Sequence, residues 1–226
     1  LSQCPADSVV VGEGEAALAE LASALEKGLD LSAVPGLCFR KDGAPARTAF
    51  RPITEDIGAL PWPAYELINF DAYRLPPTRA VRHGRVSSIL SARGCNYNCS
   101  FCSHHYGYNC RVRIRTPEDV TEEMRHVVEK YGVTEFRFED CTFTADPERV
   151  KAICALITGK KLPVVWNCDI RADTASDEIF GAMKAAGCRR VFLGVETGSQ
   201  ELLGTLSANK DIRLDQVRNA VKLAKK

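Results

Sequence analysis

The sequence lacks the features that would assign the chain to a membrane or to a nucleic acid. Its 30 Lys and Arg residues are balanced by 29 Asp and Glu residues, so the formal net charge is only +1. A charge this close to zero gives no reason to expect binding to nucleic acid or to an anionic membrane. No apolar run reaches the roughly 18 residues that a membrane-spanning helix requires. With 45% apolar and 26% charged residues, the composition is that of an ordinary globular protein.

The sequence also shows no secretory leader or other targeting segment. Its ten cysteines are spread over what the residue pattern predicts to be a large α/β core. This distribution favours a reducing compartment, and it predicts a cytoplasmic protein with free thiols instead of disulfides. The chain begins at Leu1 and ends on a predicted helix at Lys226. We therefore expect it to be an internal fragment of a longer protein.

Three of the cysteines lie within eight residues and form the most informative feature of the chain. Cys95, Cys99 and Cys102 have the spacing C-x3-C-x2-C, with the aromatic residue Phe101 just before the last cysteine. Three thiolates this close together can converge on one metal centre. Structural zinc and closed iron–sulfur clusters normally take four protein ligands. Three local ligands therefore suggest a centre with one position open for chemistry.

Other ligand sets remain possible from the spacing alone. A fourth ligand from Cys110, His104 or His105 would instead give a structural zinc site, and Cys110 would also allow a closed electron-transfer cluster. The context favours the open centre, because an apolar strand at 86–90 and a turn through Gly94 precede the cysteines. In α/β folds, the carboxyl ends of strands are where ligands bind.

Cys95, Cys99, Phe101 and Cys102 together resemble the hallmark of the radical S-adenosylmethionine (radical SAM) enzymes. The resemblance implies that the three thiolates hold a 4Fe-4S cluster, and that the amino and carboxylate groups of S-adenosylmethionine chelate the fourth iron. It further implies reductive cleavage of S-adenosylmethionine to a 5′-deoxyadenosyl radical. A low-potential donor such as flavodoxin or ferredoxin would supply the electron to such a cluster.

The rest of the chain alternates between predicted helices and strands. Strands are predicted at 133–138, 164–166 and 190–195, and helices are predicted to start near Thr116, Asp146, Ser176 and Asp215. Such alternation predicts parallel strands joined by crossover helices. The resemblance then implies an α/β fold, a partial (β/α)6 TIM-like barrel of which about four βα units are present.

Acidic and basic residues follow the predicted strands. The resemblance implies that Glu139 and Asp140, where the family commonly has Gly-Gly-Glu, help to bind the methionine amino group of S-adenosylmethionine. Arg171 suits the methionine carboxylate geometrically. Residues 194–199 resemble the family's ribose-binding segment, so the resemblance implies that Glu196 accepts hydrogen bonds from the ribose hydroxyls. Phe101 is expected to contact the cofactor by shielding the cluster, or in a structural role only to plug the core beside it.

Each of these residues also has a structural interpretation. Glu139 and Asp140 could cap the following helix or pair with Arg137, Glu196 could be a solvated turn residue, and Arg171 could be a structural arginine. The sequence alone does not decide between the two interpretations.

Residues before the cysteine motif differ in character. A predicted strand near residues 7–11 leads into a helix with Leu18, Leu21 and Leu25 directed inward, and a Pro-rich run follows. This stretch resembles the closing piece of the Rossmann-like, cobalamin-binding domain that precedes the radical SAM core in one branch of the family. We therefore predict such a domain end at 1–40, a linker at 41–80 and a radical SAM core at 81–226.

The resemblance implies a small-molecule substrate and cobalamin-dependent chemistry on an unactivated carbon, by methyl transfer, cyclisation or rearrangement. The alternatives are a radical SAM enzyme that never binds cobalamin and a non-catalytic zinc or iron–sulfur module.

Overall fold

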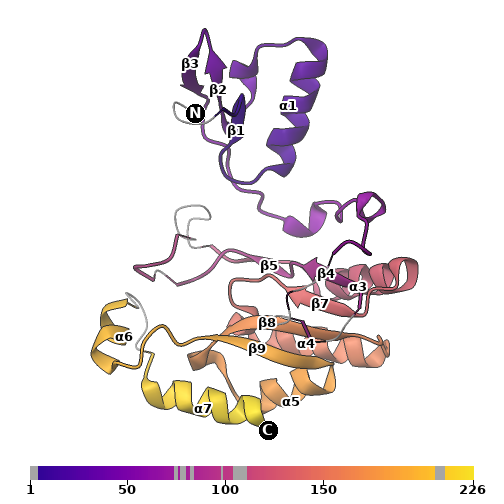
Figure 1. Cartoon of the computed structure of the whole chain (residues 1–226), viewed down its shortest axis with the longest axis vertical. Coiled ribbons are helices and arrows are strands. Elements are labelled where there is room, and N and C mark those ends of the chain that lie inside the picture. The colour runs from indigo at the N-terminus through magenta and orange to yellow at the C-terminus, as the bar shows by residue number, and fades with distance from the viewer. Residues whose placement is uncertain are drawn as a thin grey trace. The chain divides into compact units, whose positions relative to one another are not determined.

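The computed structural model describes residues 5–73, 76, 80–81, 84–97, 99–103, 111–206 and 212–226 (Figure 1). They fall into two compact units, Leu1–Glu55 and Asp56–Lys226. His104, His105 and Cys110, the alternative metal ligands, lie outside the described residues. No helix in the described ranges combines the length and the apolar character needed to cross a bilayer.

The first unit is a small antiparallel sheet with one helix. Strand β2 (Leu37–Lys41) pairs with both β1 (Ser8–Val10) and β3 (Ala44–Arg47), and α1 (Glu15–Lys27) lies between β1 and β2 in the chain. Helix α1 ends at Gly28, which adopts the left-handed conformation with φ of 63°. The core of the unit contains the buried residues Leu21, Ala24, Val34, Leu37 and Phe39.

Helix α1 presents a different face to this core from the one predicted. Leu21 is buried as expected, but Leu18 and Leu25 are 61% and 62% exposed, and Ala17 and Ala24 are buried instead. The prediction that Leu18 and Leu25 face inward is therefore wrong. Both sets of residues have helical spacing, so periodicity alone could not separate them.

The second unit is built on four parallel strands in the order β4-β7-β8-β9 (Figure 1). The strands are β4 (Val86–Ile89), β7 (Glu135–Phe138), β8 (Val165–Arg171) and β9 (Cys188–Gly194). The helices are α3 (Pro117–Tyr131), α4 (Pro147–Gly159), α5 (Asp177–Ala185), α6 (Gln200–Leu206) and α7 (Leu214–Lys225). The predicted α/β fold with four βα units of a partial barrel is confirmed.

Shorter elements complete the chain. Strands β5 (Ala92–Arg93) and β6 (Arg113–Ile114) form a small antiparallel pair beside the cysteine motif. The 3-10 turns are η1 (Leu31–Ala33), η2 (Ile57–Ala59), η3 (Tyr65–Leu67), η4 (Phe143–Ala145) and η5 (Ala172–Thr174). Helix α6 was not predicted from the sequence.

Local capping explains why the predicted helix starts are found where expected. The side chains of Thr116, Asp146 and Ser176 each accept a hydrogen bond from the backbone N–H three residues later. Such contacts satisfy donors that the first helical turn leaves unpaired. Pro117 and Pro147 occupy first-turn positions that need no N–H donor.

The core of the second unit lies between the parallel sheet and its helices. All four residues of β7 are buried, as in strands covered on both faces. Phe138, Phe143 and Trp166 pack together with ring centroids 4.5 to 5.3 Å apart. Tyr65 and Phe70, from the Pro-rich stretch that follows the first unit, also belong to this core. The predicted 41–80 linker thus contains β3 of the first unit and two core residues of the second.

Candidate active site

The cysteine loop begins where β5 ends, just beyond the carboxyl end of β4. Cys95, Cys99 and Cys102 are free and partly exposed. The backbone N–H of Cys102 donates to the carbonyl of Cys99 at 3.0 Å, which closes a tight turn within the motif. Partial burial raises the pKa of the Cys95 thiol. Cys99 and Cys102 are therefore held together by this turn, on the edge where the parallel strands end.

Gly94 is required by the backbone at the start of this loop. Its φ is +94°, a conformation that L side chains rarely adopt, and a Cβ placed there would lie 1.9 Å from the carbonyl oxygen of Arg111. The loop can therefore pass this close to the Arg111 backbone only because residue 94 has no side chain.

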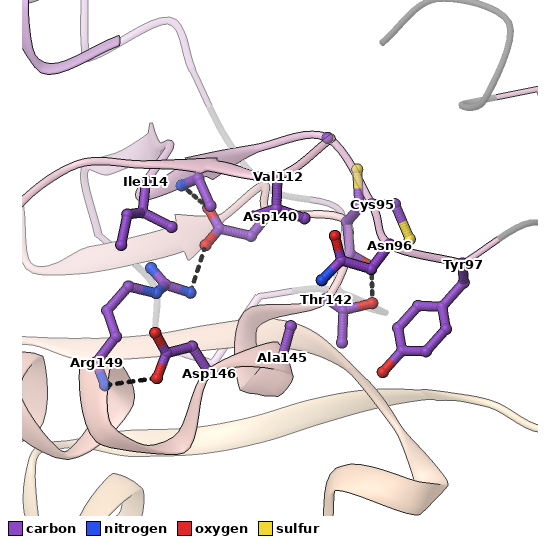
Figure 2. Close-up of a pocket in the computed structure, with 13 residues that line it drawn as sticks. Cys95, Asn96, Tyr97, Val112, Ile114, Asp140, Thr142, Ala145, Asp146 and Arg149 are labelled. Carbon is purple, nitrogen blue, oxygen red and sulfur yellow. Dashed lines mark hydrogen bonds and ion pairs between the residues drawn. The ribbon is translucent and has the colours of Figure 1, made fainter. Parts of the chain in front are cut away.

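Asp140, which follows β7, anchors the residues before the loop. Its carboxylate is buried and accepts hydrogen bonds from the backbone N–H groups of Ser91 at 2.7 Å and Ala92 at 3.1 Å, and from the Ser91 hydroxyl. Burial raises the pKa of this carboxyl, and the charge of Arg149 and the donors on Ser91 and Ala92 oppose that shift. Figure 2 shows Asp140 next to the guanidinium of Arg149.

A cavity of about 20 Å³ separates the cysteine loop from the β7–α4 connection (Figure 2). Cys95, Asn96 and Tyr97 line it from the loop, and Cys141 and Thr142 line it from the connection. This volume is about that of one water molecule. Burial is the main cause that raises the pKa of Cys141 to about 11, and nearby Cys95 contributes less. The Cys141 thiol therefore stays neutral.

Arg171, at the end of β8, lies against the cysteine loop. Its guanidinium carbon is 3.6 Å from the centroid of the Tyr97 ring, and its Nη1 is 3.8 Å from the Sγ of Cys99. Asp173 pairs with its Nε at 3.1 Å. Because arginine stays protonated, this contact places a fixed positive charge beside one of the three thiols.

Arg137 lies on β7 and is buried at the same end of the sheet. It donates to Asn167 Oδ1 at 3.0 Å and to Asp169, both on β8, and its guanidinium lies 4.8 Å from the centroid of the Phe192 ring on β9. Its Nε is 3.5 Å from Glu139 Oε2. The alternative interpretation of the acidic pair is thus partly realised, because Glu139 pairs with Arg137 while Asp140 pairs with Arg149.

The two remaining predicted acids are accessible. The Glu139 side chain is 41% exposed, and its Oε1 accepts a hydrogen bond from the Ser88 hydroxyl at 3.1 Å. Glu196 is exposed and has a φ of +60°, which is uncommon for a residue other than glycine. A Cβ at Gly194 would lie 2.7 Å from Glu196 Oε1, so that glycine makes room for the carboxylate. Backbone strain of this kind clusters at functional sites.

Phe101 is not where it was expected. Its side chain is 53% exposed, so the expectation that it plugs the core is wrong. The residue lies inside the tight turn between Cys99 and Cys102, whose middle positions are open to solvent. A contact between Phe101 and a bound cofactor stays a prediction.

The donor set fits an iron–sulfur cluster. Three thiolates are soft ligands of the kind that hold such clusters. Within the described part of the chain, no three Cys, His, Asp or Glu side chains are grouped as the ligands of a single metal ion would be. A cluster distributes its cysteines over separate iron atoms, so its ligands stand farther apart than those around one ion.

Sequence reasoning missed Ser91, Tyr97 and Arg149 among the side chains that shape this site, and it named Arg137 only as a partner for the acidic pair. Arg137 gave the clearest signal, because a charged residue in a buried strand must find a buried partner. The other three gave none, since their roles depend on contacts between elements distant in sequence.

Comparison with known proteins relates the chain to one family of enzymes. The family model described as "Radical SAM superfamily" matches residues 89–226. The chain is 34% identical to an uncharacterized methyltransferase of Pyrococcus horikoshii, over 100% of this chain and 48% of that protein. It is 29% identical to the anaerobic magnesium-protoporphyrin IX monomethyl ester cyclase of Rubrivivax gelatinosus, over 97% of this chain and 39% of that protein. The chain thus spans about half or less of the length of these relatives.

Solved structures share the fold. The radical S-adenosylmethionine methyltransferase TsrM from Kitasatospora setae, with cobalamin and a [4Fe-4S] cluster bound, is similar with a TM-score of 0.73 and 22% identity. The match covers 97% of this chain and 43 to 44% of that one. The cobalamin-dependent S-adenosylmethionine radical enzyme OxsB gives a TM-score of 0.76 at 18% identity, over 99% of this chain and 32% of that one.

The position of Gly94 leads to a direct test. We expect Gly94→Ala to displace the loop, because the added methyl group would collide with the Arg111 carbonyl. The iron and sulfide retained after anaerobic reconstitution should fall severalfold below the wild-type content. Gly198→Ala is the matched control, since a Cβ there meets nothing within 4 Å. Equal iron content in the two variants would contradict the proposed role of Gly94.

Proposed function

Since the chain belongs to the radical SAM superfamily, we propose that it is part of an enzyme that cleaves S-adenosylmethionine reductively to a 5′-deoxyadenosyl radical. The observation that carries this proposal is the cysteine loop itself. It places three accessible thiols at the edge where four parallel strands end. Polar groups that follow the neighbouring strands lie at the same edge, as a ligand bound beside the loop would require.

Cys95, Cys99 and Cys102 would hold the 4Fe-4S cluster. When bound, the cluster supplies the electron for the cleavage of the carbon–sulfur bond, and the protein supplies binding and orientation. Arg171 contributes a fixed positive charge next to the Cys99 sulfur. Tyr97 stacks on that guanidinium and holds it beside the loop.

The S-adenosylmethionine contacts are assigned by accessibility. We propose Glu139 for the methionine amino group and Glu196 for the ribose hydroxyls, because both carboxylates are exposed at the carboxyl ends of their strands. Arg171 remains the candidate for the methionine carboxylate, with a geometry suited to it. Of the acidic pair we assign the cofactor contact to Glu139 alone, because Asp140 is buried while the Glu139 side chain is 41% exposed.

We further propose that the enzyme binds cobalamin. TsrM has cobalamin bound in its structure, and OxsB is a cobalamin-dependent enzyme. The similarity to these proteins extends over 97% and 99% of this chain, so it includes the N-terminal unit. Residues 1–40 would then close a Rossmann-like cobalamin-binding domain, 41–80 would link it to the core, and 81–226 would be the radical SAM core.

The reaction would modify an unactivated carbon of a small-molecule substrate by methyl transfer, cyclisation or rearrangement. Methyltransferases and cyclases are both among the relatives. A low-potential donor such as flavodoxin or ferredoxin would deliver the electron. Because a cluster of this kind is sensitive to oxygen, we propose a reducing, cytoplasmic setting.

Electron paramagnetic resonance tests the cluster and its open iron together. The full-length protein, reconstituted anaerobically and reduced, should show a 4Fe-4S signal that changes when S-adenosylmethionine is added, with roughly four iron atoms per chain. Cys99→Ala should abolish it. Cys154→Ala is the matched control, because that cysteine is buried on α4 away from the loop. Zinc at about one per chain, without visible absorption, would contradict the proposal.

A second experiment tests the assignment of Glu196. Replacing Glu196 with Gln removes a charge-assisted hydrogen bond of about 1.5–3 kcal/mol. The Kd for S-adenosylmethionine, measured on the reconstituted protein, should therefore rise roughly 10- to 100-fold. Glu201→Gln, at an exposed position on α6, should leave the Kd unchanged. An equal effect of the two substitutions would point to a general loss of negative charge instead of a specific contact.

A further inference from the structure

We infer that Arg149 is a positioning residue for the cysteine loop, and that it acts through Asp140 and Ser91. The expected effect on the cluster rests on the proposed function, whereas the hydrogen-bond network is taken from the structure. Arg149 lies in the first turn of α4 and is buried, with its side chain 4% exposed. It is separated by more than fifty residues from the first cysteine. Its contacts nevertheless converge on the backbone that leads into the motif.

The three side chains form a closed hydrogen-bond network. Arg149 Nη1 donates to the Ser91 hydroxyl, and that hydroxyl donates in turn to Asp140 Oδ2. Arg149 Nη2 lies 3.4 Å from the same Asp140 oxygen. Asp140 Oδ1 accepts from the backbone N–H groups of Ser91 and Ala92. Every one of these partners donates to Asp140, which is the pattern that an ionised carboxylate accepts.

The network fixes the chain immediately before the cysteines. Ser91 and Ala92 precede Cys95 by four and three residues. From the other side, Arg115 donates its backbone N–H to the Ser91 carbonyl at 3.0 Å and its Nη1 to the Leu90 carbonyl at 2.9 Å. The exit from β4 is therefore held by Arg149 of α4, by Asp140 of the β7–α4 connection and by Arg115 of the β6–α3 connection.

An arginine is needed at this position because of its shape as well as its charge. The planar guanidinium reaches three acceptors at once, namely Ser91 Oγ, Asp140 Oδ2 and the carbonyl oxygen of Phe143 at 2.9 Å. It also lies 5.5 Å from the centroid of the Phe143 ring. A lysine would keep the charge but could not span these acceptors in the same way. Arg149→Lys should therefore give an intermediate phenotype.

Hydrogen exchange on the full-length protein without its cluster tests the geometry directly. In Arg149→Met and Asp140→Asn, the backbone amides of residues 90–93 should exchange about tenfold faster or more than in the wild type. Arg149→Lys should fall between. Ile153→Ala is the matched control, because Ile153 is buried on the same helix but contacts the core. It should lower the melting temperature without a selective loss of protection at residues 90–93.

Paramagnetic resonance and redox titration on the reconstituted protein test the consequence. Arg149→Met should alter the signal of the cluster or its midpoint potential at unchanged secondary structure, and Ile153→Ala should not. If the wild type forms no cluster, the proposed function fails while the exchange experiment still decides the positioning role. Unchanged exchange at residues 90–93 in Arg149→Met would overturn the inference.

If Arg149→Met does not fold, Ser91→Ala provides a second test of the inference. It removes only the bridging hydroxyl, which is the smallest change that breaks the network. Exchange at Ala92 should again become faster, and an unchanged rate would equally overturn the inference.

Discussion

The carboxylate of Asp140 accepts hydrogen bonds from the backbone of Ser91 and Ala92, and this contact ties the cysteine loop to the end of β7. Burying a carboxylate without hydrogen-bond partners would strongly destabilise the fold. The groups that donate to Asp140 must therefore stay in place. Arg149 balances its charge from α4. Because β4 and β7 are parallel neighbours, their carboxyl ends meet, and the short reach between them makes this bridge possible. The position of the three thiols depends on it.

Three arginines with different tasks surround the site. Arg149 is buried beneath the loop, Arg171 lies beside the Cys99 sulfur, and Arg137 bridges β7 and β8 inside the sheet. Each of these arginines pairs with an aspartate, so the positive and negative charges nearly cancel at this edge of the sheet. The exposed acids Glu139 and Glu196 remain available to a ligand that carries cationic or hydroxyl groups. This distribution suits S-adenosylmethionine, which presents both.

The features that the sequence predicted correctly are local ones. The helix starts at Thr116, Asp146 and Ser176 follow from side chains that bond to their own first turns. The cysteine motif is likewise confined to eight residues, and strand–helix alternation was enough to predict the parallel sheet. Each of these depends on neighbours in the chain.

The features that were missed depend on contacts between distant elements. The inward face of α1 could not be chosen from the sequence, because two sets of residues both have helical spacing, and the set that is buried contains Ala17 and Ala24. Phe101 was expected in the core but lies in a turn that faces solvent. Asp140 and Glu139 are adjacent in sequence, yet one is buried beneath the loop and the other is accessible. Only the three-dimensional path of the chain distinguishes them.

Electron–nuclear double resonance with S-adenosylmethionine labelled with ¹⁵N at its amino group tests the central claim most directly. If the three-cysteine loop leaves one iron open, the reduced full-length protein should show a ¹⁵N hyperfine coupling to the cluster, which is lost with unlabelled cofactor. A cluster signal without that coupling would mean that S-adenosylmethionine does not bind the iron. The loop would then belong to a closed cluster, and the account given for Glu139, Arg171 and Glu196 would fail with it.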